Sequence, residues 1–534
     1  MPEAYEATAV SPSQIPAQAA DKASLTTWIA VIAGMIGAFM AILNIQITNA
    51  SLLYIEGGIG TGVDNGTWIS TSYLIGEIVV IPLTAYLSRV FSFRNYILAS
   101  TVFFALFSMA CAFARDLPSM IALRGLQGFA GGVLIPMAFT MVATKLPKAQ
   151  QPVGLAMFAI AVTFAPAIGP TIGGYLTENY GWQTIFFVNT LPSIVMIVAL
   201  YLTLEPEPMR LGLFREGDWA GIVTMAIGLS SLQTLLEEGN KDDWFGSPFI
   251  VHLAVIAAVF LLAFLVIELT AKKPLVNLRL LLNRNFGIGT ITNVLVGFAL
   301  FGSIYVLPQY LGQVQGYNAE QIGLVLAWTG LPQLVLIPLV PWLMKRFDIR
   351  YIASLGILIF AASCFMNTTM SIDYSGDQLW LPNIVRAIGQ ALVITPLTAV
   401  AMFSIASKDA GDASGLFNML RNLGGAVGTA ALATIITKRE QFHSNTIGQS
   451  VTLSRDEVRQ RIEALTNYFM AHGVPDHEAA RHQAIVELGK VVKRESFVLA
   501  FSDTFAVIGV VLVIAAVVLL FARRGQAGAA AAAH

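Results

Sequence analysis

The hydrophobic positions of this chain fall into fourteen long runs. A bilayer has a hydrocarbon core about 30 Å thick, which takes about 20 apolar residues to cross as a helix, and only a helix or a closed barrel satisfies its own backbone there. The pattern therefore predicts an all-α polytopic membrane protein. Its fourteen transmembrane helices are expected near residues 27–50, 66–86, 96–114, 119–143, 153–176, 183–204, 218–237, 248–270, 286–311, 320–344, 350–371, 380–405, 412–437 and 498–522.

The two ends of the chain are polar or of low complexity. Residues 1–24 hold three prolines and lack the short apolar core and small-residue cleavage site of a secretory signal, so they are expected to be a disordered tail. Residues 525–534 are rich in alanine and glycine and are expected to be a second unstructured tail.

One polar segment, 438–497, is too long to be a tight turn between spans. Ser454 and Glu457 have the spacing of a capping box, and Pro475 and Asp476 precede a second helical pattern. The segment is therefore expected to form a helical hairpin outside the membrane.

The orientation of the spans follows from the basic residues of the short connections. The connections on one side hold seventeen lysine and arginine residues, from Lys22 to Arg524, whereas the short connections on the other side hold only Arg115 and Lys241. Cytoplasmic loops carry the excess of lysine and arginine. Both termini are therefore expected to be cytoplasmic and the hairpin to lie on the opposite side.

Spans one to six and nine to fourteen share an organisation that predicts an internal repeat. Arg124 precedes Pro136 in the fourth run of the first block, and Arg386 precedes Pro396 in the fourth run of the second block. Two six-helix halves place the substrate site of a transporter between them, near the midplane. The expected domains are a first half at 25–210, two inserted helices at 211–272, five helices of the second half at 273–437, the hairpin at 438–497 and the last helix at 498–524.

Composition and charge exclude several classes of protein. Hydrophobic residues make up 56% of the chain and charged residues 12%, against about 25% charged residues in a typical soluble domain. A net charge of -1 leaves no basic excess for nucleic acid. Cysteines and histidines show no metal-site spacing, and no nucleophile or paired-acid site indicates a membrane-embedded transferase.

Five stretches resemble the fourteen-span drug–proton antiporter branch of the major facilitator superfamily, in particular its EmrB-type members. They are LNIQITNASL (43–52), GTWISTSYLIGEIVVIPLTAYLSRVFSFR (66–94), ALRGLQGFAGG (122–132), APAIGPTIGGYL (165–176) and WQTIFFVNTLP (182–192). The Gly169, Pro170, Gly173 and Gly174 pattern is similar to the antiporter signature of that superfamily. The resemblance implies its fold, with two inserted helices between the halves.

Two departures from the family pattern change the expected chemistry. In the loop after span two, Ala85, Arg89 and Ser92 stand where Gly, Asp and Gly are expected, although Arg94 is kept. In span one, Asn44 stands where the family has an acid. The proton-binding group is therefore expected elsewhere.

Charged residues inside the spans are the candidates for proton coupling, because a charge at the bilayer centre costs about 2.5 to 3.5 kcal/mol. Glu77 is the deepest acid. Burial favours its protonated form and a guanidinium favours its charged form, so we expect Glu77 to carry the proton and Arg124 to set its affinity. The alternative is a permanent ion pair that only orders the bundle.

The remaining charges in the spans are expected to have structural roles. Arg421 and Asp503 are expected to pair in the second half, and Arg386 is the repeat counterpart of Arg124 without an evident partner. Glu268, near the end of span eight, is expected to reach the membrane surface with no further role.

Three polar stripes in the first half predict an aqueous cavity. They include Asn44 and Thr48 in span one, Ser70 and Tyr73 in span two, and Gln127 in span four. Around this cavity the resemblance implies a set of cargo-contacting side chains: Phe39, Tyr73, Gln127, Phe158, Phe164, Phe298, Tyr305, Gln309 and Trp328.

Span five has the residues of a hinge. Pro170 removes a backbone donor and should bend the helix, and Gly169, Gly173 and Gly174 should let neighbouring helices approach closely. The alternative is a static, close-packed helix pair.

These expectations combine into one function. The resemblance implies proton-coupled export of hydrophobic or amphipathic compounds across a bacterial inner membrane, with the proton gradient as the driving force and no cofactor. The resemblance further implies a periplasmic membrane-fusion adaptor and an outer-membrane channel as partners, with the hairpin as either docking surface or mobile cap. The alternatives are import or flipping of a lipid-like or organic-acid substrate by the same fold, and, less favoured by the residues, a membrane-embedded transferase.

Overall fold

The computed structural model describes residues 22–61, 63–271, 274–406 and 409–523. Within these ranges, fourteen helices are long and apolar enough to cross a membrane, which confirms the predicted number. Of the two expected tails, residues 525–534 and all but the last three residues of 1–24 lie outside the described ranges.

The first half begins at a side-chain cap. Ser24 Oγ accepts a hydrogen bond from the backbone of Thr27 at 3.1 Å, satisfying one of the free N–H groups at the start of the first span. Span four consists of two helices in line, as does span six. The elements are α1 (Leu25–Ala50), the short α2 (Leu52–Ile59), α3 (Val63–Phe91), α4 (Phe93–Cys111), α5 (Leu117–Gly131), α6 (Leu134–Lys145), α7 (Gln151–Tyr180), α8 (Thr184–Phe187) and α9 (Thr190–Thr203).

The second half repeats this plan and ends in two very long helices. Its spans nine to fourteen are α12 (Arg284–Gln313), α13 (Ala319–Leu336) with η4 (Ile337–Leu339) and α14 (Val340–Arg346), α15 (Ile349–Met366) with η5 (Asn367–Thr369), α16 (Gly376–Ala391) with α17 (Ile394–Met402), α18 (Ala410–Gly448) and α20 (His477–Leu520). The helix α19 (Asp456–Ala471) lies between the last two.

The internal repeat is visible where the fourth span of each half is interrupted. In the first half the break separates α5 from α6, and Pro136 follows in the first turn of α6. In the second half the break separates α16 from α17, and Pro396 stands at the corresponding place. A proline fits there because the first N–H groups of a helix lack a partner anyway.

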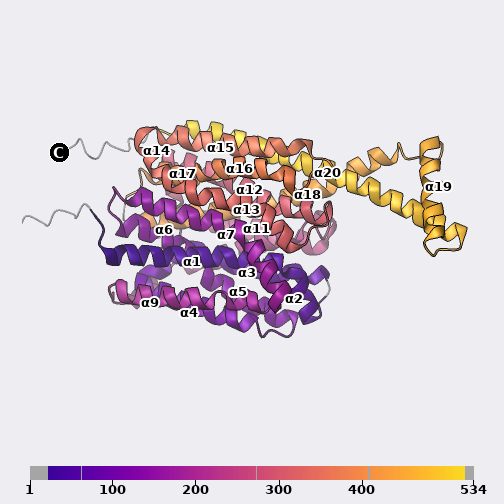
Figure 1. Cartoon of the computed structure of the whole chain (residues 1–534). Helices are drawn as coiled ribbons and strands as arrows, with labels where there is room; N and C mark the ends of the chain where they lie inside the picture. The colour runs from indigo at the N-terminus through magenta and orange to yellow at the C-terminus, as the bar shows by residue number, and fades with distance from the viewer. Residues whose placement is uncertain (1–21, 62, 272–273, 407–408, 524–534) are drawn as a thin grey trace, which may run out of the picture.

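The buried apolar side chains form two clusters, each made mainly of one half. Ile78, Ile81 and Leu83 of the first half belong to the cluster of the second half. In Figure 1 the first half, coloured indigo to magenta, lies alongside the second half, coloured orange to yellow, with their helices running in similar directions. Both ends of the chain emerge at the same end of the bundle (Figure 1), which we call the termini end. The two halves are therefore packed on each other through apolar side chains that their cores share.

The two inserted helices are α10 (Trp219–Glu238) and α11 (Pro248–Thr270), flanked by η1 (Leu211–Glu216), η2 (Trp244–Gly246) and η3 (Leu278–Leu282). α10 packs on α3, where the buried Glu238 accepts hydrogen bonds from Thr67 Oγ1 at 3.1 Å and Thr71 Oγ1 at 3.2 Å. The inserted pair is thus fastened to the helix that carries Glu77.

Glu268 in α11 does not reach the membrane surface, so that expectation was wrong. Its side chain is 2% exposed, and one carboxylate oxygen accepts the backbone N–H of Val276 at 3.1 Å. The chain folds back after α11 and supplies this donor, which is why the carboxylate stays inside.

The expected hairpin is instead an extension of the last two membrane helices. α18 and α20 continue out of the bundle, and α19 lies across their outer end (Figure 1). The boundaries expected at 438 and 497 therefore fall inside continuous helices. Asp476 accepts from the backbone of Ala479 at 2.9 Å and caps α20 as expected, but α19 begins after Arg455 without the side-chain cap expected from Ser454.

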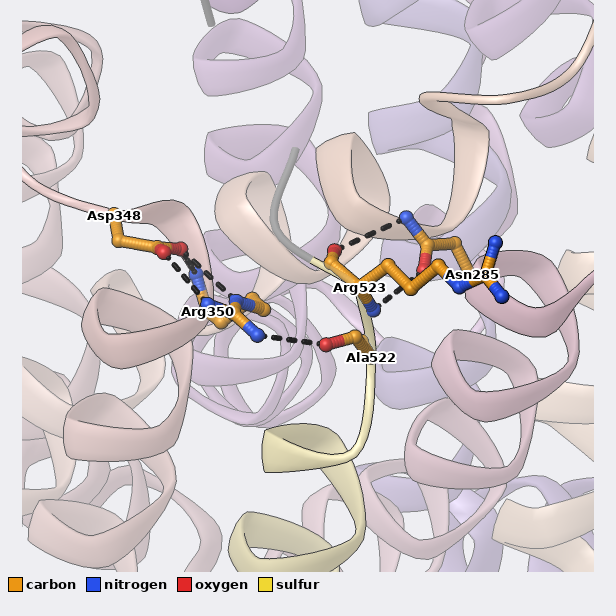
Figure 2. A network of polar contacts seen from close by, with 5 residues as sticks. All are labelled: Asn285, Asp348, Arg350, Ala522 and Arg523. Carbon is orange, nitrogen blue, oxygen red and sulfur yellow. Dashed lines mark hydrogen bonds and ion pairs between the residues drawn. The ribbon is translucent and has the colours of Figure 1, made fainter. Parts of the chain in front are cut away.

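The last helix is held at the termini end by side chains of two other spans. Figure 2 shows Asn285 exchanging two hydrogen bonds with the backbone of Arg523, at 2.8 and 3.3 Å. Arg350, which is paired with Asp348, donates to the carbonyl of Ala522 at 2.7 Å. These donors satisfy carbonyls that the end of a helix leaves free.

Candidate transport site

Seven charged side chains are buried among the described residues, and four of them lie well inside membrane spans. The ones near helix ends are Glu56, Glu238 and Glu268; the ones inside spans are Glu77, Arg124, Arg386 and Arg421. Because a charge in the hydrocarbon region is costly, each of the inner four needs a partner or a function.

Glu77 lies at the contact between the two halves. Its side chain is 4% exposed, and one carboxylate oxygen accepts a hydrogen bond from Asn422 Nδ2, in α18 of the second half, at 3.2 Å. The other carboxylate oxygen is buried without a hydrogen-bond partner. Arg421, next to Asn422, is a positively charged neighbour of Glu77, as is Arg124.

Arg124 is occupied by neutral groups of its own half. Its guanidinium donates to Asn44 Oδ1 at 2.5 Å, to Gln127 Oε1 at 2.8 Å and to the carbonyl of Ile69 at 3.3 Å. It also lies over the ring of Tyr73, 4.4 Å from the centroid. Asn44 thus gives Arg124 a neutral acceptor and no counter-charge.

The expected role of Arg124 at Glu77 stays a prediction. The described residues show no ion pair between them, and Arg421 is a second guanidinium near Glu77. Asn422 and Arg421 were missed as partners of Glu77 because they lie about 345 residues along the chain from it, so no local spacing indicates them.

The expected pairing of Arg421 with Asp503 was wrong. Asp503 Oδ2 accepts from Arg439 Nε at 2.6 Å and contacts His443 Nε2 at 2.7 Å. Arg439 and His443 lie 18 and 22 positions beyond Arg421, which is about 27 to 33 Å along a helix. Asp503 therefore ties α18 to α20 where the two helices leave the bundle.

The polar stripes of the first half are used mainly in packing it. Tyr73 is fully buried and donates to the carbonyl of Ala41 at 3.2 Å. Ser51 and Thr177 share a hydrogen bond of 2.6 Å between α1 and α7. These contacts replace the aqueous cavity that the stripes predicted at Tyr73 and Gln127.

Tyr305 and Gln309 do line a cavity, of about 230 Å³, within the second half. It lies toward the end of the bundle opposite the termini, because Gln313 at the end of α12 also lines it. Its other walls are Asn240, Ala433, Ile436, Thr437, Phe497 and Phe501.

A second cavity, of about 10 Å³, lies between the halves. α7 forms its first-half wall with Val162, Thr163, Pro166 and Ala167. α12, α13 and α16 form the other wall with Leu300, Ile304, Leu326, Thr329, Arg386 and Gln390. Arg386 is thus the buried charge that faces the space between the halves.

The remaining aromatic candidates are distributed over several environments. Phe39 and Phe164 stack across α1 and α7 with centroids 6.3 Å apart, and Phe158 is buried edge-on against Phe139. Phe298 is partly buried in the core of the second half, and Trp328 is 48% exposed. The structure thus brings Phe39 and Phe164 together but not the whole set.

The glycines of span five permit the close approach that the sequence predicted. A Cβ on Gly169 would lie 2.5 Å from Gln46 Cβ, and one on Gly173 would lie 2.9 Å from the carbonyl oxygen of Ile47. α1 and α7 therefore pack backbone to backbone. The bend at Pro170, which lies inside α7, stays a prediction.

The termini end carries a contact between the halves that the sequence did not indicate. Arg89 Nη2, at the end of α3, lies 3.6 Å from Asp412 Oδ1 at the start of α18. Arg94 points elsewhere and donates to the carbonyl of Tyr201 at 2.8 Å, near the end of α9. Its place corresponds to that of Arg350 in Figure 2, which holds the end of α20.

The fold and these buried charges define a helical membrane transporter with two six-helix halves. Residues 34–429 match the family model of the Major Facilitator Superfamily, and the chain belongs to that family. The xylose–proton symporter XylE shares the fold, with a TM-score of 0.58, 14% identity and coverage of 94% of this chain and 97% of that one.

Several relatives match most of the chain. The colistin resistance protein EmrB of Acinetobacter baumannii is 32% identical over 94% of this chain and 97% of its own length. The multidrug export protein EmrB of Escherichia coli K12 is 32% identical over 79% of this chain and 83% of its own length. The fatty acid resistance protein FarB of Neisseria gonorrhoeae is 28% identical over 91% of this chain and 93% of its own length.

Proposed function

We propose that this chain exports hydrophobic and amphipathic toxic compounds, including drugs, by alternating access in exchange for protons. Its family and the names of its relatives support multidrug export. The observation that carries the proton coupling is Glu77, a buried acid hydrogen-bonded across the contact between the halves.

The geometry of Glu77 links protonation to movement. Charged Glu77 is attracted to Arg421 and accepts from Asn422, both on α18. Adding a proton removes the attraction, and moving α3 away from α18 removes the same contact. Because the two processes act on one interaction, each changes the equilibrium of the other, as thermodynamic linkage requires.

The test is transport by the Glu77→Gln variant in liposomes with an imposed pH gradient. We expect accumulation of drug against its concentration gradient to fall at least about fivefold, because drug movement is no longer coupled to protons. Movement of drug down its gradient should continue, because the cavity between the halves remains. Glu463→Gln, the same change on the exposed face of α19, is the matched control. Undiminished pH-driven accumulation by Glu77→Gln refutes the role of Glu77, and reversing the gradient distinguishes export from import.

The location that we propose is the inner membrane of a bacterium, with both termini in the cytoplasm. The distribution of basic residues supports this orientation. The proton gradient then supplies the driving force, and no cofactor takes part.

We further propose that the outer ends of α18 and α20, together with α19, dock a periplasmic adaptor that leads to an outer-membrane channel. They project beyond the bundle (Figure 1), and Tyr468 on α19 and Val486 and Val491 on α20 are about half exposed. Deleting 450–490 should abolish co-purification with the adaptor but leave the bundle folded, since Asp503 still ties α18 to α20. Unchanged co-purification contradicts this docking role.

A further inference from the structure

Arg386 occupies the wall of the cavity between the halves. It lies on α16 and is 5% exposed, and the residues opposite it belong to α7 of the first half. A substrate site between two six-helix halves is expected at this interface. The side chain is therefore placed where cargo would pass.

The positive charge of Arg386 has no counter-charge among the described residues. Within the part of the chain that the structure describes, Arg386 forms no ion pair and donates no hydrogen bond, and its Nε is buried without a partner. Its charged group lies 5.8 Å from the ring centroid of Phe360. Since an unpaired buried charge is strongly unfavourable, a ligand that brings a negative charge would be favoured here.

Arg386 differs in this respect from its repeat counterpart in the other half. Its counterpart Arg124 donates to Asn44, Gln127 and the carbonyl of Ile69. Arg124 is thus satisfied by its own half, whereas Arg386 is not. The same position serves packing in one half and is left available in the other.

Gln390 adds a second free donor beside Arg386. The two residues are four apart on α16, which places them on one helical face, and both line the cavity. Gln390 Oε1 accepts from Gln333 Nε2 at 2.9 Å, which orients the amide so that Gln390 Nε2 is buried without an acceptor. A guanidinium and an amide N–H side by side suit the two oxygens of a carboxylate.

The buried charges of the span interiors point to the same ligand. Among the described residues buried inside the spans there are three arginines and a single acid, Glu77. The arginines are Arg124, Arg386 and Arg421. Glu77 lies with Arg421, so the excess positive charge is located at Arg124 and Arg386. Only Arg386 of these two lacks acceptors.

We propose that Arg386 and Gln390 form the subsite that binds the anionic head group of amphipathic cargo, such as a carboxylate on an alkyl chain. This inference rests on the proposed export function and names a substrate class for it. The apolar walls at Val162, Pro166, Leu300 and Leu326 suit the alkyl part. The cavity of about 10 Å³ holds about one water molecule, so the ligand enters only when α7 moves away from α13 and α16.

The test compares two amphiphiles with similar alkyl chains and opposite charges, decanoate and decyltrimethylammonium. Binding of each is measured on full-length protein in lipid nanodiscs, with empty nanodiscs subtracted, and transport of each is measured in liposomes. The variants are Arg386→Gln and Arg386→Lys. Arg346→Gln, which removes an exposed arginine on α14, is the matched control.

We expect Arg386→Gln to weaken decanoate binding at least about tenfold and to leave decyltrimethylammonium binding within about twofold, because a charge-assisted pair is lost. Arg386→Lys should retain part of the decanoate affinity, and it also serves if the Gln variant fails to fold. Equal decanoate affinity in all variants, or an equal loss for both amphiphiles, overturns the subsite. If the unsubstituted protein transports decyltrimethylammonium but not decanoate, the subsite is overturned and the proposed export stands. If it transports neither compound, the proposed export is refuted as well.

Discussion

At the scale of single residues, Arg124 shows how this chain holds a charge in the membrane without an acid beside it. Asn44 and Gln127 accept from its Nη1 at 2.5 and 2.8 Å. A neutral acceptor satisfies the guanidinium but leaves its charge uncompensated. The first half therefore keeps one positive charge that an acid at position 44 would balance.

Asn44→Leu should destabilise the protein by about 1.5 to 3 kcal/mol, because it removes an acceptor from a buried charged donor. Thermal unfolding measures this with a thiol-reactive dye, since Cys111 and Cys364 are both buried and react only on unfolding. Asn179→Leu is the control, because the amide of Asn179 is exposed and bonds only within its helix. Equal midpoints for the two variants contradict the structural role of Asn44.

The sequence could place Glu77 and Arg386 but not their surroundings. The depth of Glu77 in an apolar run is a local property, so burial followed from the sequence. Its contact with Asn422 depends on how two halves meet, and the same holds for Asp503, which pairs with Arg439 and not with Arg421. Partners across distant spans need the three-dimensional packing.

At the scale of elements, the packing of α7 on α1 sets how closely these helices approach. Gly173→Ala would place a Cβ 2.9 Å from the carbonyl oxygen of Ile47. Backbone cannot give way as a side chain can, so we expect a loss of about 1 to 3 kcal/mol in stability and slower transport. Gly57→Ala in α2 is the control, because a Cβ there has no atom within 4 Å. A stable, fully active Gly173→Ala variant would show that the close approach is dispensable.

Elements followed from the sequence where local signals determine them. The fourteen runs gave the spans, and Asp476 caps α20 as its position predicted. Local patterns did not reveal that α18 and α20 continue beyond the bundle, because the long polar segment also fits separate helices. Asp503 of α20 contacts Arg439 and His443 of α18, and these residues too are far apart in the sequence.

At the scale of the whole molecule, two kinds of contact hold the halves together. Glu77 and Asn422 meet inside the bundle, and Arg89 and Asp412 meet at the termini end. Alternating access requires contacts at the ends to break and re-form while the central site stays between the halves. The pair at the termini end is thus suited to hold that end closed.

Breaking the pair of Arg89 and Asp412 should open the termini end more often. Arg89 is 57% exposed, so the pair contributes about 0 to 1 kcal/mol, and Asp412→Asn should shift the populations by at most about fivefold. Ser414→Cys reports the opening, because Ser414 is fully buried and donates to the carbonyl of Pro136 in the other half at 3.4 Å.

In the Ser414→Cys variant, adding Asp412→Asn should make maleimide labelling at position 414 faster. Adding Arg89→Asp together with Asp412→Arg should return the labelling rate toward that of Ser414→Cys alone. The two natural cysteines are buried and add little labelling. Asp377→Asn, an exposed acid at the opposite end of the bundle, should leave the rate unchanged. If the charge swap labels as fast as Asp412→Asn, attraction between these two residues does not hold the end closed, because the swapped pair restores the same attraction with its signs exchanged.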